Sequence, residues 1–340
     1  MTPKLSICIA TYNRGSFISE TLESILSQIT DNVEIIVVDG ASPDNTSEIM
    51  ADYVSSCPQL KYFRESENSG VDADFDKAVS YATGEYCWLM ADDDLLFPGA
   101  LNRVLISIPD DTQLLVVDAE IRNADLSEVL EESRTNLKVD RLYKKGQHED
   151  FFVDMASHLS FIGCVIIRRD IWLSRQRAPY YGTLFIHIGV IFQHPPLDQI
   201  LVISKPAIII RYGNAMWTPR AFEIWMFKWP NLIWSFPDFS EKAKQTICKI
   251  GSWTKIKHVF HYRAKGAYSA LEFKKHFYKE ENSFLRVILY LIAIFPSKLA
   301  NFLSAIYVLK NKSKRLVIYD LKHSPCASFL SHYLNRKLSN

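Results

Sequence analysis

The sequence contains no Cys-x-x-Cys pair and no cysteine and histidine spacing of the zinc-finger type. Its 6 cysteines are scattered along 340 residues. This pattern excludes a metal finger and favours free thiols in a reducing compartment. Residues 1–10 also lack the long apolar segment and small-residue cleavage site of a secretory signal peptide. We therefore expect a protein that is cytoplasmic or faces the cytoplasm.

The chain has almost no net charge, because an acidic part and a basic part cancel to +1. Through Thr254 it has 23 Lys and Arg against 34 Asp and Glu, and from Lys255 onward it has 16 against 4. A basic C-terminal part of this kind is typical of binding to nucleic acid or to an anionic membrane surface. A solvated basic face is the alternative.

The sequence also lacks an uninterrupted apolar run long enough to cross a bilayer. Residues 284–309 are strongly apolar, but Arg286 and the break at 296–298 divide them into two pieces of about a dozen residues. Four basic residues follow within 310–315. This pattern predicts interfacial helices on the inner membrane surface, with no nucleic acid partner, and a helical hairpin that covers the rest of the protein is the alternative.

Over the first hundred residues, strand-like apolar segments alternate with segments of helical periodicity. We expect strands at 5–10, 33–38, 60–64 and 86–90, and helices at 17–28, from 44 or 46 to 54, and at 74–82. This alternation predicts an α/β fold with a parallel sheet covered on both faces. Ligands of such folds bind beyond the carboxyl ends of the strands.

Polar residues follow each of these four predicted strands, so they should meet at one edge of the sheet. They are residues 11–14, 39–42, 65–70 and 92–94. The adjacent carboxylates Asp92, Asp93 and Asp94 favour a hard divalent cation, although an acidic helix N-terminus would look the same. Asp39 could accept a hydrogen bond from uracil or cytosine, or simply belong to a turn.

Four motifs occur in order along this part of the chain. They are Cys8-Ile9-Ala10-Thr11-Tyr12-Asn13-Arg14, Val37-Val38-Asp39-Gly40-Ala41-Ser42-Pro43-Asp44-Asn45-Thr46, Asn68-Ser69-Gly70, and Ala82-Thr83-Gly84-Glu85-Tyr86 followed by the acidic triplet and Pro98-Gly99-Ala100-Leu101. Their order and spacing resemble the family 2 glycosyltransferase domain, of GT-A fold, over residues 4–105. The segments 84–88 and 181–187 are most similar to the abequosyltransferase-like branch, which decorates O-antigen repeat units.

The resemblance implies a GT-A domain over 1–215, with a nucleotide-binding half (1–105) and an acceptor half (106–215), and a helical basic region over 216–340. It implies a nucleotide-sugar donor, Mn²⁺ or Mg²⁺, and inversion at the anomeric carbon. By the same likeness the donor-binding residues are Thr11, Asn13, Arg14, Asp39, Asn68, Asp74 and Asp92. Ala91 stands where many relatives begin the acidic motif, so Asp93 ranks first as metal ligand, with Asp92 and Asp94 as supporting ligands or water-mediated contacts.

An inverting transfer also needs a general base, which relatives usually supply from a Glu-Asp pair. Here Glu149-Asp150 comes early, before the acceptor-side segment 161–169. The position after that segment holds His187, which is the first candidate because an imidazole ordinarily titrates near neutral pH, with Asp198 and Asp150 behind it. A hydrogen-bonded structural histidine is the alternative.

These features predict transfer of a sugar, such as the dideoxyhexose abequose, to a lipid-linked (undecaprenyl diphosphate) oligosaccharide. The expected place is the cytoplasmic face of a bacterial inner membrane, in O-antigen or surface polysaccharide synthesis. A nucleotidyltransferase and a non-catalytic glycan-binding protein are the rivals. The first would need a glycine- and lysine-rich triphosphate loop, which residues 10–15 do not supply.

Overall fold

The structure is a computed structural model that describes residues 2–109, 111–310 and 315–333. The chain forms two compact units. Unit 1 is Met1–Arg211 with Phe236–Ile247, and unit 2 is Tyr212–Ser235 with Cys248–Asn340. The first boundary lies near the expected division at residue 215, but unit 1 also includes Phe236–Ile247, which the sequence analysis assigns to the C-terminal region.

Unit 1 is built on one sheet with the strand order β3-β2-β1-β4-β9-β6-β10-β5, with β7 beside β6 and β8 beside β10. The strands are β1 (Leu5–Thr11), β2 (Val33–Asp39), β3 (Leu60–Arg64), β4 (Tyr86–Ala91), β5 (Leu95–Leu96), β6 (Leu114–Arg122), β7 (Val129–Glu131), β8 (Arg141–Lys144), β9 (Val165–Arg168) and β10 (Gln199–Arg211). The four strands β3, β2, β1 and β4 are parallel. The predicted α/β fold with a mostly parallel central sheet is therefore confirmed.

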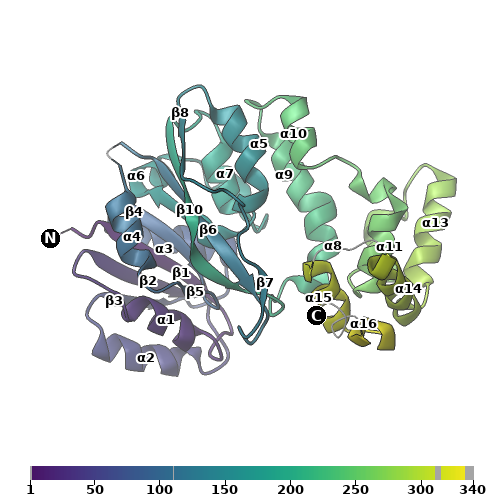
Figure 1. The fold of residues 1–340 in the computed structure, drawn as a ribbon, viewed down its shortest axis with the longest axis horizontal. Helices are drawn as coiled ribbons and strands as arrows, with labels where there is room; N and C mark the ends of the chain where they lie inside the picture. Colours follow the sequence, from purple (N-terminus) through teal and green to yellow (C-terminus); the bar gives the residue numbers. More distant parts are fainter. Residues whose placement is uncertain (1, 110, 311–314, 334–340) are drawn as a thin grey trace. The chain divides into compact units, whose positions relative to one another are not determined.

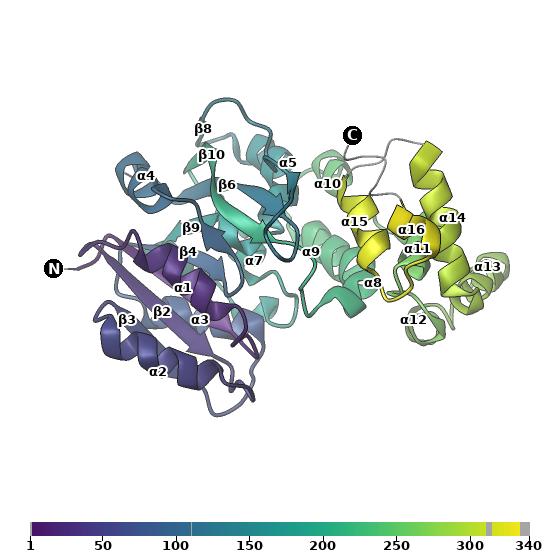
Figure 2. The same ribbon diagram turned by 60° about the horizontal axis from the view of Figure 1, so that its bottom comes forward.

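Helices cover both faces of this parallel part. Helices α1 (Ile18–Leu26) and α2 (Thr46–Ser56) connect strands that step toward β3, and α3 (Val71–Tyr81) connects β3 back to β4. Because such crossovers are right-handed, reversing the step places α3 on the opposite face from α1 and α2 (Figures 1 and 2). All seven residues of β1 and of β2 are buried, as expected for central strands with two covered faces.

The predicted helix at 74–82 begins three residues earlier in the structure, at Val71. Gly70 precedes it with φ 89°, a left-handed conformation that glycine adopts without a steric penalty. The helix therefore starts directly after the Asn68-Ser69-Gly70 turn, and its first turns carry the buried acids Asp72, Asp74 and Asp76.

Two of these acids hold the second half of unit 1 to the first. Asp72 accepts the backbone N–H groups of Leu184 (2.8 Å) and Ile186 (3.0 Å). One helical turn later, Asp76 accepts the indole N–H of Trp172 at 2.9 Å and forms an ion pair with Arg177. The segment that leads into α7 (Ile186–Phe192) is thus fixed to α3. The other helices of unit 1 are α4 (Ala100–Ser107), α5 (His148–Leu159), α6 (Arg169–Ser174) and α10 (Glu241–Ile247).

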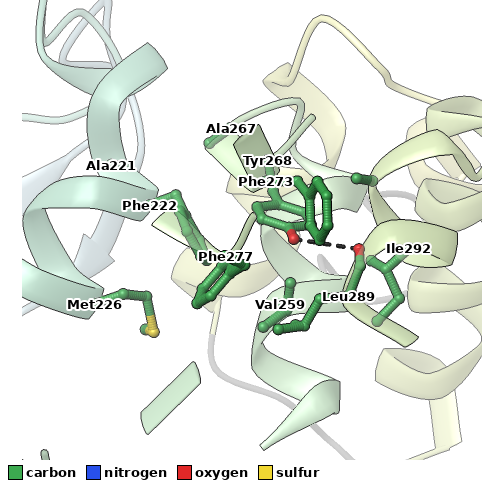
Figure 3. Packing of buried hydrophobic residues seen from close by; sticks show 11 residues of the cluster. Ala221, Phe222, Met226, Val259, Ala267, Tyr268, Phe273, Phe277, Leu289 and Ile292 are labelled. Carbon is green, nitrogen blue, oxygen red and sulfur yellow. Dashed lines mark hydrogen bonds between the residues drawn. The ribbon is translucent and has the colours of Figure 1, made fainter. Parts of the chain in front are cut away.

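Unit 2 consists of helices in the described residues. They are α8 (Ala221–Glu223), a π-helical turn (Ile224–Lys228), α9 (Trp229–Ser235), α11 (Ile256–Ala264), α12 (Ala270–His276), α13 (Ser283–Ile294), α14 (Ser297–Lys310), α15 (Arg315–His323) and α16 (Phe329–Tyr333). One core contains Phe222, Tyr268, Phe277 and Leu289, with the Tyr268 hydroxyl donating to the Leu289 carbonyl (Figure 3).

A buried amide joins several helices of unit 2. The Asn301 side chain on α14 is fully buried and donates from Nδ2 to the carbonyls of Ala264 (3.1 Å) and Leu321 (3.0 Å). Its Oδ1 accepts the Ser328 N–H at 2.9 Å. Both ends of the amide are therefore satisfied by backbone groups from different segments.

We predict that Asn301→Leu lowers the free energy of unfolding by about 2–4 kcal/mol, because it leaves buried backbone groups without partners. Asn102→Leu, at an exposed position of α4, is the matched control and should change stability by less than about 0.5 kcal/mol. Urea unfolding followed by circular dichroism measures both. Equal stabilities of the two variants would contradict the role of the amide.

Candidate functional site

The loops that follow β1, β2 and β4 begin at the same edge of the sheet. In the strand register Thr11 lies beside Asp39, and Ala10 lies beside Ala91. The polar residues at these strand ends therefore meet, as parallel strands require. Two hydrogen bonds tie the first two loops together, from Asn13 N–H to the Ser42 hydroxyl (2.9 Å) and from Arg14 N–H to the Thr46 hydroxyl (3.2 Å).

Asp39 is fully buried at the end of β2, and its carboxylate is held in place from two sides. Oδ1 accepts the Ser42 N–H at 2.8 Å, and Oδ2 accepts the Tyr62 hydroxyl at 2.5 Å. Burial, together with the bond to Asp39, raises the pKa of Tyr62 well above its usual value, so the phenol stays a proton donor. Each carboxylate oxygen has a second lone pair, which leaves Asp39 able to accept one more donor.

Asn68 and Asp74 lie beside Asp39, across Gly40. A Cβ atom on Gly40 would come within 2.7 Å of Asp74 Oδ2 and 3.6 Å of Asn68 Oδ1, so only glycine fits there without a shift. Asp74 accepts the Ser69 hydroxyl at 2.9 Å, and burial raises its pKa. The structure thus brings Asp39, which ends β2, together with Asn68 and Asp74, which follow β3.

The acidic triplet divides into two parts with different surroundings. Asp92 and Asp93 face Arg14, with its Nε 3.5 Å from Asp92 Oδ1 and its Nη2 3.3 Å from Asp93 Oδ2. Asp94 instead is 2% exposed, and its Oδ1 accepts the backbone N–H of Arg211 at 2.9 Å. Only the first two carboxylates belong to the same charged group as Arg14.

Arg211, the last residue of β10, holds the acidic segment in place. Its Nε donates to the Asp93 carbonyl at 3.0 Å, its Nη1 to the Ala124 carbonyl at 3.0 Å, and its Nη2 to the Glu20 carboxylate at 2.6 Å. The guanidinium groups of Arg14 and Arg211 each lie 5.4 Å from the centre of the Phe17 ring. One aromatic ring therefore supports both cations by cation–π contact.

The site carries more negative charge than its buried surroundings favour. Burial, reinforced by the neighbouring Asp93, raises the pKa of Asp92 to about 7, against the opposing effect of Arg14. Burial and Asp93 also raise the pKa of Asp94 well above its usual value. A further cation next to Asp92 and Asp93 would relieve this repulsion.

Asp92 and Asp93 fit a divalent cation of the magnesium type, which often takes only one or two protein carboxylates and completes its shell with phosphate and water oxygens. Among residues 2–109, 111–310 and 315–333, no group of three or more His, Cys, Asp or Glu is arranged to hold a metal ion. The protein would therefore supply two carboxylates, and phosphate and water oxygens would supply the remaining ligands of the cation. Asp94, expected as a supporting metal ligand, does not fit it, because its carboxylate points to β10.

His187 does not have the surroundings of a general base. It is 1% exposed, its Nε2 lies 2.8 Å from the Leu159 carbonyl, and burial lowers its pKa to about 4. A buried neutral imidazole that donates to a backbone carbonyl is the structural histidine named above as the alternative. The assignment of His187 as base is therefore corrected.

The two fallback bases lie at the wrong edge of the sheet. Asp198 directly precedes β10, which runs parallel to β6, and β6 in turn has the direction of β4. Asp198 is therefore exposed at the amino edge, whereas Asp93 lies at the carboxyl edge. Asp150 is also exposed, in the first turn of α5, after β8 ends beside Gln199 at the same amino edge. Both assignments are corrected.

Sequence reasoning missed Tyr62 and Arg211. Tyr62 lies within a short strand and two residues before its end, so no strand-end signal marks it. Arg211 closes an apolar run at the end of β10, but its partners Glu20, Asp93 and Ala124 are about 90 to 190 residues away. Only the folded topology brings them together.

Comparison with known proteins identifies the class of enzyme. A family model described as glycosyl transferase family 2 matches residues 6–172. Abequosyltransferase RfbV of Salmonella typhimurium is 30% identical over 223 residues, which are 62% of this chain and 67% of that protein. The chain is therefore a glycosyltransferase. It belongs to glycosyltransferase family 2, whose members commonly use divalent metal ions.

Other relatives match shorter stretches or the fold alone. The GalNAc(5)-diNAcBac-PP-undecaprenol beta-1,3-glucosyltransferase of Campylobacter jejuni is 31% identical over 104 residues, 30% of this chain and 34% of that protein. The crystal structure of S. aureus TarS 1-349 in complex with UDP superposes with a TM-score of 0.55 at 16% identity, over 92% of this chain and 90% of that one. At this level of identity the likeness shows a shared fold and nothing more.

The pKa of Asp92 is higher in the folded protein than in the unfolded chain. The free energy of unfolding therefore falls as the pH rises from about 4 toward 7 and Asp92 ionises. We predict that Asp92→Asn raises the free energy of unfolding by about 1–3 kcal/mol at pH 8, in metal-free buffer. The gain should shrink as the pH falls toward 4 and vanish below about pH 3, where Asp92 is protonated in both the folded and the unfolded states. A constant difference between pH 4 and pH 8 would contradict the charge repulsion.

Proposed function

We propose that this glycosyltransferase transfers a sugar from a nucleotide-sugar donor to an acceptor hydroxyl, with inversion at the anomeric carbon. The observation that carries the proposal is the meeting of Asp92, Asp93 and Arg14 with Asp39 at one edge of the sheet. This edge offers hydrogen-bond acceptors for a nucleobase and paired charges for a diphosphate. Both belong to the same ligand, a nucleotide sugar.

In the proposed complex, Asp39 accepts an N–H of the nucleobase, held at the correct angle by Ser42 and Tyr62. Thr11 and Asn13 lie next along the ribose, and Asn68 and Asp74 border the base on the other side of Gly40. S. aureus TarS has been crystallised with UDP and with UDP-GlcNAc, which supports a pyrimidine nucleotide in this fold.

Asp93, with Asp92 beside it, would hold the Mn²⁺ or Mg²⁺ ion, and Arg14 lies within reach of the same diphosphate. When bound, the ion would neutralise the negative charge of the leaving nucleoside diphosphate. Arg211 positions the Asp93 backbone, and Phe17 keeps both guanidinium groups in place. The acceptor hydroxyl would then attack the anomeric carbon from the face opposite the diphosphate, and the bond from that carbon to the diphosphate oxygen would break, which inverts the configuration. The hydroxyl proton would pass to a general base or to solvent water.

Donor and acceptor identities are proposed from the relatives. The Salmonella relative is named as an abequosyltransferase, so a dideoxyhexose such as abequose is the proposed donor sugar. The Campylobacter relative is named for a substrate linked to undecaprenol through a diphosphate, so a lipid-linked oligosaccharide is the proposed acceptor. These choices place the enzyme in O-antigen or surface polysaccharide synthesis, at the cytoplasmic face of a bacterial inner membrane.

The rival readings of the sequence are set aside by the family. A nucleotidyltransferase would release pyrophosphate, and a glycan-binding protein would turn nothing over, whereas a family 2 glycosyltransferase releases a nucleoside diphosphate. The released product is therefore the most direct readout of the reaction class.

We predict that Asp93→Ala lowers transfer at least about 100-fold, since it removes a charge that holds the cation at the diphosphate. The assay offers UDP-, CDP-, GDP- and dTDP-linked sugars with and without Mn²⁺, and measures the nucleoside diphosphate released. The anomeric configuration of the product is read by proton NMR.

Asp150→Asn and Asp198→Asn are the matched controls, because each removes one carboxylate at the opposite edge of the sheet. Both should retain activity within about twofold of the unaltered enzyme. Metal-independent transfer by Asp93→Ala would refute the proposed role of this residue. A product with retained configuration would refute the inverting reaction.

A further inference from the structure

Helix α13 in unit 2 is apolar apart from Ser283 and Arg286, yet only one of its sides is buried in the described part of the chain. Leu289 and Ile292 belong to the core of unit 2 (Figure 3). Ala293 is buried in the same core. On the other side, Phe284 is 76% exposed and Leu291 is 54% exposed. A helix that is hydrophobic all round is normally covered all round, by protein or by lipid. The exposed side of α13 therefore requires an occupant.

Helix α14 repeats the pattern. Ala300, Ala305 and Val308 are buried in a second core, whereas Leu299, Phe302 and Leu303 are exposed. The axes of α13 and α14 differ by 101° across a short break at Pro296. We use the name α13–α14 face for eight of their exposed apolar residues, which are Phe284, Val287, Tyr290, Leu291, Ile294, Leu299, Phe302 and Leu303.

The charged residues within these two helices are all of one sign. Neither helix contains an acidic residue, and their charged residues are Arg286, Lys298 and Lys310. By sequence, the whole of unit 2 has 19 Lys and Arg against 5 Asp and Glu. A basic surface with an apolar centre is complementary to a layer that is anionic outside and apolar within.

We propose that the α13–α14 face docks on the surface of an anionic lipid bilayer, with its apolar side chains inserted among the lipids and Lys298 and Lys310 at the headgroups. In the described residues no single helix is long and apolar enough to cross a membrane. Of the described helices, only α13 and α14 taken together reach that length and hydrophobicity, and they are bent relative to each other. The two helices have 12 and 14 residues, fewer than the roughly 20 that cross a bilayer, and the proposal places both along its surface.

A second copy of the chain is a poorer occupant of this face. Two such faces in contact would bring the exposed Lys298 and Lys310 of both copies together, and like charges at an interface oppose association. Anionic headgroups instead attract these lysines, so the bilayer satisfies the apolar and the charged part of the face together.

This inference rests on unit 2 alone and not on the proposed reaction. A chain that transfers sugar to a water-soluble acceptor but fails to bind vesicles would overturn the docking face and leave the reaction standing. A chain that binds vesicles but releases no nucleoside diphosphate would do the reverse.

The test is flotation of the full chain with vesicles of phosphatidylglycerol and phosphatidylcholine, compared with vesicles of phosphatidylcholine alone. We expect binding to the anionic vesicles that weakens as salt is raised. Val287→Glu with Leu291→Glu should lower the partition coefficient at least about tenfold, because two carboxylates replace inserted apolar groups. Lys298→Gln with Lys310→Gln should lower it about fivefold per lysine.

The matched control is Ile106→Glu with Val139→Glu, which adds the same charge at positions of unit 1 that are 76% and 74% exposed. It should bind as the unaltered chain does. Circular dichroism and thermal melting verify that each variant is folded. Absence of binding, equal loss in both glutamate variants, or equal binding to neutral vesicles would overturn the proposal. A lipid-free dimer that Val287→Glu with Leu291→Glu dissociates, without vesicle binding, would reassign the face to a second copy.

Discussion

The site depends on how buried negative charge is balanced at the carboxyl edge of the sheet. Asp92 and Asp93 are adjacent and nearly buried, and their repulsion, together with burial, raises the pKa of Asp92 to about 7. Arg14 balances them from the β1 loop, and Arg211 fixes their backbone from β10. Since Phe17 lies under both guanidinium groups, the loop after β1 and the end of β10 are parts of the same charged assembly.

The nucleotide-binding half could be predicted because its information is local. Strands β1, β2 and β4 are short and mostly apolar, and polar residues end or directly follow each of them. Parallel strands bring these loops to one edge. Position along the chain therefore stands for position in space. Gly40 is a case that local sequence does not reveal. A side chain is excluded there by Asp74, which lies 34 residues further along the chain.

The acceptor half could not be read in the same way, because strand direction alternates there. β9 is antiparallel to β4 and β6, so a residue after one strand and a residue after the next lie at opposite edges. Asp198 looks well placed in sequence and lies at the amino edge. His187 follows the expected strand, but α3 fixes its segment through Asp72, so the imidazole is buried against the Leu159 carbonyl.

Unit 2 shows why periodicity alone does not distinguish a core helix from a surface helix. The apolar residues of α13 point both to Tyr268 and Phe277 in the core and away from it, so the sequence reads as one hydrophobic stretch. Only one side of α13 contributes to the core, where Leu289 and Ile292 are buried in the same cluster as Phe222. The opposite side adds nothing to that core, and its exposure costs free energy in water. The restriction of charge within α13 and α14 to Arg and Lys is therefore explained by an anionic surface rather than by the needs of the fold.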